Sequence, residues 1–189
     1  MPPAPEPPAA SNRSFEDVVQ DPPQGHRDWW SDDRVAYLCD QMFDRHRAWV
    51  EQRRSGERHH YATAFRRVRL HPDGGKRSIA ELRTDGIAGC LRTPKGGSGR
   101  QILVRVGRGC VDARLVSPRE CASLMGVDGY RVETTVNKAL LGLGDAVCGD
   151  AVTWIARNNL VPLLECRPPS PTRRGRTARR MAKSKPSRG

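Results

Sequence analysis

The sequence predicts an α+β fold in which helices come first and last and strands lie between them. Three observations support this class. Apolar residues recur at helical spacing between residues 31 and 53, strand-like segments flank glycine-rich turns between 61 and 115, and a complete helix-start signal follows at Ser117. The 189 residues leave room for one domain of about 150 ordered residues between two low-complexity ends.

The first helical segments come early in the chain. Residues 14–19 have the composition of a single helical turn, which Asp21-Pro22-Pro23 then ends. Ser31 is a good N-cap, and the apolar residues after it favour a helix with one buried face. A second helix is expected over 45–53, before Ser55-Gly56.

Two pairs of strands are expected next. Residues 61–70 and 76–82 flank the turn-forming cluster 71–75, which predicts a first hairpin. Residues 101–106 and 110–115 flank Gly107-Arg108-Gly109 and predict a second one.

Two helices are predicted to complete the fold. In the first, Ser117 and Glu120 can cap each other's amides, Pro118 stands at the first helical position and Gly126 offers a left-handed stop. The second is expected over roughly 146–159, with Val147, Trp154 and Ile155 on one apolar face.

The net charge of +12 is concentrated near one end of the sequence. Residues 167–189 hold nine Lys/Arg and no acid, so this basic arm can bind polyanions by counterion release or act only as a solubility tail. Six cysteines show no zinc-ligand spacing, which argues against a metal site. No secretory signal is recognisable, and no run of residues approaches the roughly 20 apolar residues of a membrane span.

The loop over residues 90–101 is the best candidate for a recognition surface. It combines cations, hydroxyls and an amide with flexible glycines, and it lacks the sequence of a phosphate-binding P-loop. Arg and Gln suit guanine and adenine edges, and Lys, Ser and Thr suit phosphates. The predicted DNA contacts are Arg92, Thr93, Lys95, Ser98, Arg100 and Gln101. Taken without context, a plain surface loop explains the same residues.

The stretch Ser117-Pro-Arg-Glu-Cys-Ala-Ser-Leu-Met-Gly126, followed by Gly144-Asp-Ala-Val147, resembles motifs IX and X of bacterial DNA (cytosine-5) methyltransferases. Residues 89–104 resemble the end of that family's target recognition domain, and residues 14–19 resemble the stretch after motif VIII. The resemblance implies a target-recognition-like region (14–114) and a motif IX and X helical region (115–164). Composition predicts a Pro/Ala-rich disordered extension (1–13) before them and a disordered basic tail (165–189) after them.

The resemblance also implies roles for individual residues. Ser117, Pro118, Arg119 and Glu120 would organise motif IX and support the recognition region. Gly144, Asp145, Ala146 and Val147 would form one wall of an S-adenosyl-L-methionine pocket, although Asp145 replaces the usual Asn. The two C-terminal helices would pack on a Rossmann-like methyltransferase domain. A packed helix with Asp150 in its first turn is the structural alternative for this last block.

The catalytic chemistry of that family is missing from the sequence. Its nucleophilic cysteine follows a proline, and none of the six cysteines here does. The cofactor motif Phe-x-Gly-x-Gly-Gly and the motif Glu-Asn-Val are also missing. We therefore predict no catalytic residue in this chain, and we expect Cys121 and Cys148 to be packing residues.

These observations predict the DNA-recognising portion of a restriction-modification methyltransferase in the bacterial cytoplasm. It would bind double-stranded DNA, share S-adenosyl-L-methionine with a catalytic subunit carrying motifs I to VIII, and have no membrane contact. The alternatives are a stand-alone DNA-binding protein, a truncated relic, and a small enzyme built around His59-His60 and Tyr61.

Overall fold

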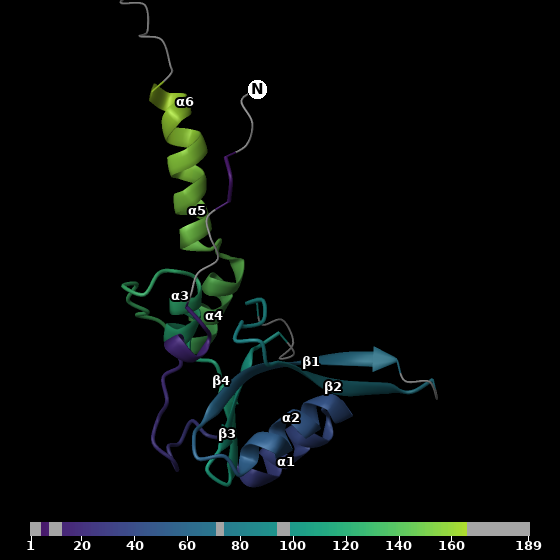
Figure 1. Cartoon of the computed structure of the whole chain (residues 1–189). Helices are drawn as coiled ribbons and strands as arrows, with labels where there is room; N and C mark the ends of the chain where they lie inside the picture. Colours follow the sequence, from purple (N-terminus) through teal and green to yellow (C-terminus); the bar gives the residue numbers. More distant parts are fainter. Residues whose placement is uncertain (1–4, 8–12, 71–73, 94–98, 166–189) are drawn as a thin grey trace, which may run out of the picture.

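A four-stranded antiparallel sheet with helices on both faces organises the chain in the computed structural model, which describes residues 5–7, 13–70, 74–93 and 99–165 (Figure 1). The strands are β1 (His60–Leu70), β2 (Lys76–Arg83), β3 (Ile102–Gly107) and β4 (Cys110–Leu115), in the order β2-β1-β3-β4. The predicted α+β class is therefore confirmed.

One face of the sheet is covered by α1 (Asp32–Asp40) and α2 (Asp44–Arg54). Val35 and Leu38 of α1, Met42 just after it and Val50 of α2 pack against alternating apolar residues of all four strands. Both helices begin and end close to the predicted positions. Ser31 precedes α1 but makes no side-chain cap hydrogen bond, so its expected N-cap bond does not form.

The opposite face is covered by the turn η1 (Glu16–Val18) and by α3 (Pro118–Leu124) and α4 (Val136–Asp145). Leu103 of β3 is fully buried in this second core. Its neighbours Ile102 and Val104 point to the other face of the sheet, because successive side chains of a strand alternate. All six residues of β3 are buried, as expected for a strand covered on both sides.

The sequence analysis missed α4. Its ten residues include Gly142 and Gly144, which lower helix propensity and hide the apolar face formed by Ala139 and Leu143. The expected single helix over 146–159 is corrected accordingly: Gly144 and Asp145 end α4, and residues 146–148 connect it to the next helix.

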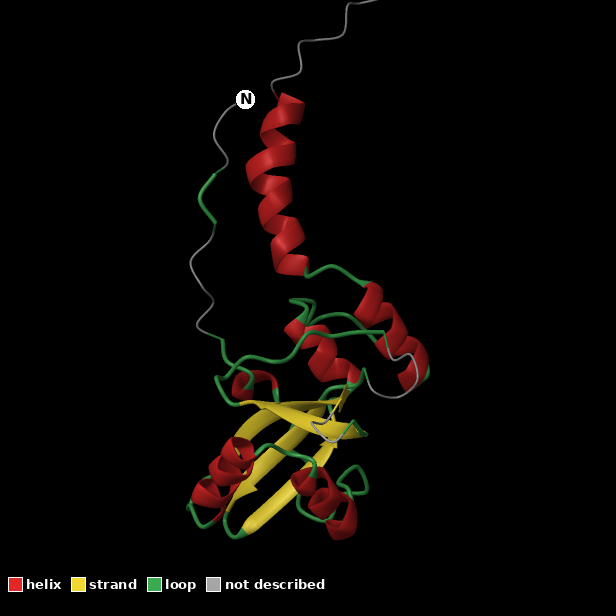
Figure 2. Cartoon of the chain, turned by 90° about the vertical axis from the view of Figure 1, so that its right-hand side faces the viewer, coloured by secondary structure: helices red, strands yellow, loops and turns green. Residues whose placement is uncertain are grey.

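The last helical segment projects from the body of the molecule (Figure 2). It consists of α5 (Gly149–Ile155), the π-helical turn η2 (Ala156–Leu160) and α6 (Val161–Glu165). We call residues 149–165 the C-terminal arm. Its root is fixed to the body, since the Gly149 amide donates a 2.8 Å hydrogen bond to the Met125 carbonyl.

Residues 136–164 correct one sequence-based expectation. They contain an 18-residue window of mean hydropathy 1.3, of which 6% is buried, and by length and composition alone this is enough to cross a membrane. The sequence analysis had expected no segment of that kind. In the structure the segment is divided between α4 and the C-terminal arm by the bend at 146–148, and it includes Asp145 and Asp150.

Residues 1–4, 8–12 and 166–189 lie outside the described residues. They include most of the predicted N-terminal extension and all of the predicted basic tail except Glu165. Arg13, which the sequence analysis placed in a disordered extension, forms a two-pronged ion pair with Asp128, with both N–O distances 2.9 Å. This pair ties the beginning of residues 13–19 to the loop after α3.

Candidate functional site

The start of α3 is built as the sequence predicts. The Ser117 hydroxyl accepts a hydrogen bond from the Glu120 amide at 3.1 Å, and the Glu120 carboxylate accepts one from the Ser117 amide at 2.7 Å. Pro118 lies in the first turn, and Gly126 adopts a left-handed φ of 70° just after the helix. All four signals come from residues close together in the chain, so the sequence alone is enough to predict them.

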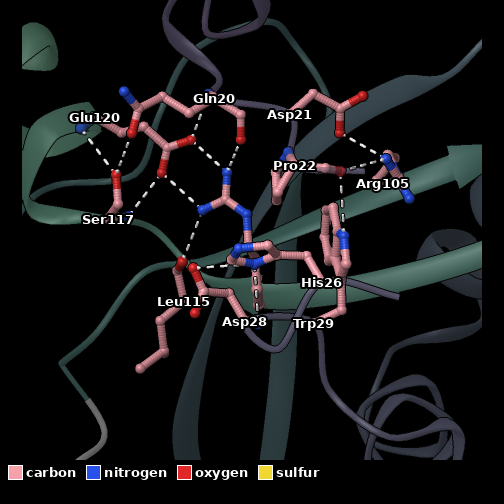
Figure 3. Close-up of polar contacts among 11 residues, drawn as sticks. Gln20, Asp21, Pro22, His26, Asp28, Trp29, Arg105, Leu115, Ser117 and Glu120 are labelled. Carbon is pink, nitrogen blue, oxygen red and sulfur yellow. Dashed lines mark hydrogen bonds and ion pairs between the residues drawn. The ribbon is translucent and has the colours of Figure 1, made fainter. Parts of the chain in front are cut away.

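Glu120 also has a role that the capping pattern does not reveal. Its side chain is completely buried and receives two hydrogen bonds from the Arg114 guanidinium, at 2.8 and 2.5 Å. The Gln20 amide donates a further bond at 2.8 Å (Figure 3). One carboxylate therefore joins α3, strand β4 and the N-terminal segment.

The electrostatics of this network favour a charged Glu120. Burial alone would raise the pKa of Glu120, but the hydrogen bonds from Arg114 and from the Ser117 amide outweigh it and hold that pKa below its usual value. Arg119, expected to share the organising role, is exposed at the surface. Arg114 takes that role instead.

A second buried guanidinium lies beside the first. Arg105 donates to Asp21 at 2.7 Å and to Asp112 at 2.9 and 3.1 Å, and its side chain is only 5% exposed. The ring of Trp29 contacts both cations, with its centroid 4.3 Å from Cζ of Arg105 and 5.4 Å from Cζ of Arg114. The segment 20–29 is thereby held against the sheet by charge-assisted bonds and cation–π contacts (Figure 3).

The candidate recognition loop contains one exposed, described cation and several inward-facing groups. Arg92 is exposed and Thr93 is half-buried, whereas Lys95 and Ser98 lie outside the described residues. Arg100 is half-buried and donates to the side-chain oxygen of Asn137 in α4.

Gln101 does not present its amide to solvent. It is 7% exposed, its Nε2 donates to the Cys90 carbonyl at 3.1 Å, and its side chain occupies the space that a Cβ on Gly89 would need. In the structure this amide holds the loop together, and contact of Gln101 with a base edge stays a prediction.

The loop and the motif X-like block are in direct contact. A Cβ added to Gly144 would lie 2.4 Å from the Thr93 nitrogen and 2.5 Å from the Arg92 carbonyl carbon, closer than real atoms approach. Only glycine therefore allows α4 and the loop backbone to pack in this way. The two segments predicted as separate sites therefore meet where Gly144 packs against Arg92 and Thr93.

The residues expected next to the cofactor lie on an open bend. Asp145, Ala146 and Val147 are all exposed, with Val147 at 69%, and the side of Gly144 faces the recognition loop. Asp150, in the first turn of α5, packs against Gly126. By themselves these residues form at most one wall of a ligand site and do not enclose a molecule of the size of S-adenosyl-L-methionine.

The thiol and histidine candidates show no catalytic arrangement in the described part of the chain. Cys121 is buried, and burial raises the pKa of its thiol to about 12, so it is a packing residue as predicted. Cys148 is half-buried. His60 accepts a bond from Arg58 at 3.4 Å, and His59 and Tyr61 line a separate cavity of about 540 Å³ with Arg105. Neither histidine is hydrogen-bonded to a described Ser, Thr or Cys.

A groove lies between the recognition loop and the sheet. Its volume is about 540 Å³, and Arg67 and Arg92 contribute positive charge to its walls beside Phe65 and Thr93. Sequence reasoning connected the loop and the basic tail with nucleic acid, but not β1. The strand side of the groove was not foreseen, because pairing between distant segments is what brings β1 next to residues 90–93.

Comparison with known proteins adds no assignment to this geometry. No protein-family model matches the chain, and a search of curated proteins found no similar sequence.

Proposed function

We propose that this chain is the DNA-recognising C-terminal portion of a DNA cytosine-5 methyltransferase, which needs a separate catalytic polypeptide carrying motifs I to VIII. In this proposal the groove and the loop around Arg92 contact double-stranded DNA. The methyl donor, S-adenosyl-L-methionine, is held mainly by the partner. This chain contributes no reacting group.

The Glu120 network is the observation that carries the proposal. The sequence resemblance gives the motif IX helix the task of supporting a recognition region. In the structure, the Glu120 carboxylate binds that helix to β4 through Arg114 and to the N-terminal segment through Gln20. A capped helix with no such connection would have supported only a generic fold.

The C-terminal arm supports the requirement for a partner. Ile155 in the arm and Val147 in the bend before it are 46% and 69% exposed, as expected for a surface that another chain covers, while Trp154 is half-buried. We propose that this face packs on the Rossmann-like domain of the catalytic polypeptide, where burial of these apolar residues would provide the driving force. Residues 144–147, at the root of the arm, would then reach the cofactor's edge.

Reconstitution tests the proposal. The purified chain and the product of the adjacent upstream reading frame are incubated, separately and together, with labelled S-adenosyl-L-methionine and mixed-sequence duplex DNA. Methyl transfer only in the mixture is the expected result. Transfer by the chain alone, or a covalent adduct of the chain alone with 5-fluorocytosine DNA, would overturn it.

The same experiment separates the alternatives. A stand-alone DNA-binding protein would bind DNA tightly with a steep salt dependence and never support methyl transfer. A truncated relic would give no transfer in any combination and would aggregate when purified.

A further inference from the structure

Strands β1 and β2 continue together beyond the sheet. β1 pairs with β3 only over residues 60–64, but it pairs with β2 from Thr63 to Leu70. On the helix side, Ala80 pairs with the segment between α1 and α2: its amide donates to the Gln41 carbonyl at 2.9 Å, and it forms a bridge with Met42. Residues 65–70 and 76–81 thus form a two-stranded ribbon that extends past α1 and α2 (Figure 1). We call it the β1–β2 ribbon.

The β1–β2 ribbon has a strongly basic face. The pairing register places Arg67 and Arg69 on the same side as Arg77, and this is the side that faces the groove and the recognition loop. Glu81 is the single acid there and forms ion pairs with Arg69 at 2.9 Å and with Arg67 at 3.9 Å. The side chains of Arg67 and Arg69 are still 46% and 47% exposed.

Arg69 and Arg77 lie directly opposite each other on neighbouring strands, which concentrates positive charge on this face. On the other side of the ribbon, Val68 and Leu70 are 65% and 73% exposed. A polyanion on the basic face would be complementary to these arginines, and a groove that encloses the ribbon would also cover the apolar groups on its other side.

We propose that the β1–β2 ribbon is a DNA-binding element that enters the major groove of a duplex, next to the recognition loop. This inference rests on the proposed DNA recognition and extends it to a second surface. The major groove admits a two-stranded ribbon, Arg matches guanine edges and phosphates, and apolar side chains fit thymine methyl groups. Arg92 continues the basic surface across the groove from Arg67.

The salt dependence of DNA binding tests the ribbon directly. The full chain is titrated with a fluorescent mixed-sequence duplex between about 50 and 200 mM salt. The variant Arg67→Gln/Arg69→Gln/Arg77→Gln is expected to reduce the slope of log K against log salt by about 2 to 3, because each lost phosphate contact removes about 0.9. The matched control Arg27→Gln/Arg45→Gln/Arg47→Gln removes three exposed charges from the segment before α1 and from α2 and is expected to keep the wild-type slope.

Each outcome bears on a different claim. If the ribbon and control variants change the slope equally, or neither changes it, the ribbon inference is wrong while the proposed function stands. If the wild-type chain shows no salt-dependent DNA binding, the proposed DNA recognition fails as well. If the ribbon variant loses binding to anionic lipid vesicles but keeps wild-type DNA binding, the ribbon serves a membrane surface and the inference is overturned.

Two additions keep the test decisive. If the triple variant does not fold by circular dichroism, single Arg67→Gln and Arg69→Gln variants replace it, each with an expected slope change of about 0.9. Competition with methyl green, a major-groove ligand, is expected to weaken wild-type binding more than that of the ribbon variant. Displacement by the minor-groove ligand netropsin alone would contradict the assigned groove.

Discussion

The body of the molecule buries most of its apolar residues, whereas the C-terminal arm leaves its apolar residues exposed. In the body, two cores on either side of one sheet bury the apolar faces of α1, α2, α3 and α4. In the arm, Val152, Leu160, Leu163 and Leu164 remain between 48% and 69% exposed. The body therefore contains what it needs to fold, whereas the arm has a surface whose burial requires something outside the described chain.

The arm nevertheless has an organised apolar stripe. Val152 and Ile155 lie three residues apart, as do Leu160 and Leu163, while Ile155 and Leu160 are separated by five. In a regular α-helix a five-residue step would move the stripe off its face. The π turn over 156–160 adds a residue to that turn and returns Leu160 toward the face of Ile155. The comparison predicts that substitutions in the body change stability and substitutions in the arm change association.

The largest effect is expected at Glu120. Glu120→Ala leaves the buried Arg114 guanidinium without its carboxylate, and breaking a buried ion pair in this way costs about 3–5 kcal/mol of unfolding free energy. Urea unfolding followed by circular dichroism measures the loss. The control Arg119→Ala, at the neighbouring exposed position, is expected to stay within about 0.5 kcal/mol of wild type. Similar values for the two variants would mean that the network does not hold the body together.

A smaller effect is expected where α4 meets the recognition loop. Gly144→Ala places a methyl group against the Arg92–Thr93 backbone, and overpacking of this kind costs about 1–3 kcal/mol. Gly142→Ala is the matched control two residues earlier in the same helix, because nothing lies within 4 Å of its Cβ position. It is expected to stabilise the chain by about 0.5–1 kcal/mol through helix propensity. Thermal unfolding of the two variants should shift in opposite directions.

Acid should weaken the same network by less than the Glu120→Ala substitution does. The pKa of Glu120 is lowered in the folded chain, so its contribution to stability is fully present above the unfolded value of about 4.3 and is lost as the pH falls through the lower folded value. Protonated Glu120 keeps part of its hydrogen bonding, which limits the loss. Unfolding free energies measured from pH 6 down to pH 3 should fall more steeply for wild type than for Glu120→Gln, and parallel profiles would show that another group controls the acid response.

Interactions between residues close together in the sequence could be predicted, whereas those between residues distant in the sequence could not. The capping of α3 was predictable because Ser117, Pro118 and Glu120 are near neighbours in the chain. Arg114 was not identified as the partner of Glu120, since nothing in the sequence shows that β4 ends with this side chain turned toward α3. Gln101 illustrates the same limit: its residue type suits DNA, but its position just before the central strand β3 turns it inward, which the sequence does not show. Gly142 and Gly144 made α4 hard to predict. The role of Gly144 follows only from its contact with Thr93, which is distant in the sequence.

The smallest effect on stability is expected in the arm, where the effect on function should be the largest. Ile155→Asp/Leu160→Asp places charges at positions that are 46% and 52% exposed, so the unfolding free energy should change by only about 0.5 kcal/mol. Methyl transfer in the reconstituted mixture should nevertheless be lost, because an unpaired carboxylate buried in an apolar interface is costly. The control Arg157→Asp/Asn158→Asp also introduces two carboxylates, at exposed polar positions of the arm, and should retain transfer. Equal loss of methyl transfer in both variants would assign the arm a purely electrostatic role. A large fall in the unfolding free energy of Ile155→Asp/Leu160→Asp would place these two residues in the core of the body instead of on a docking face.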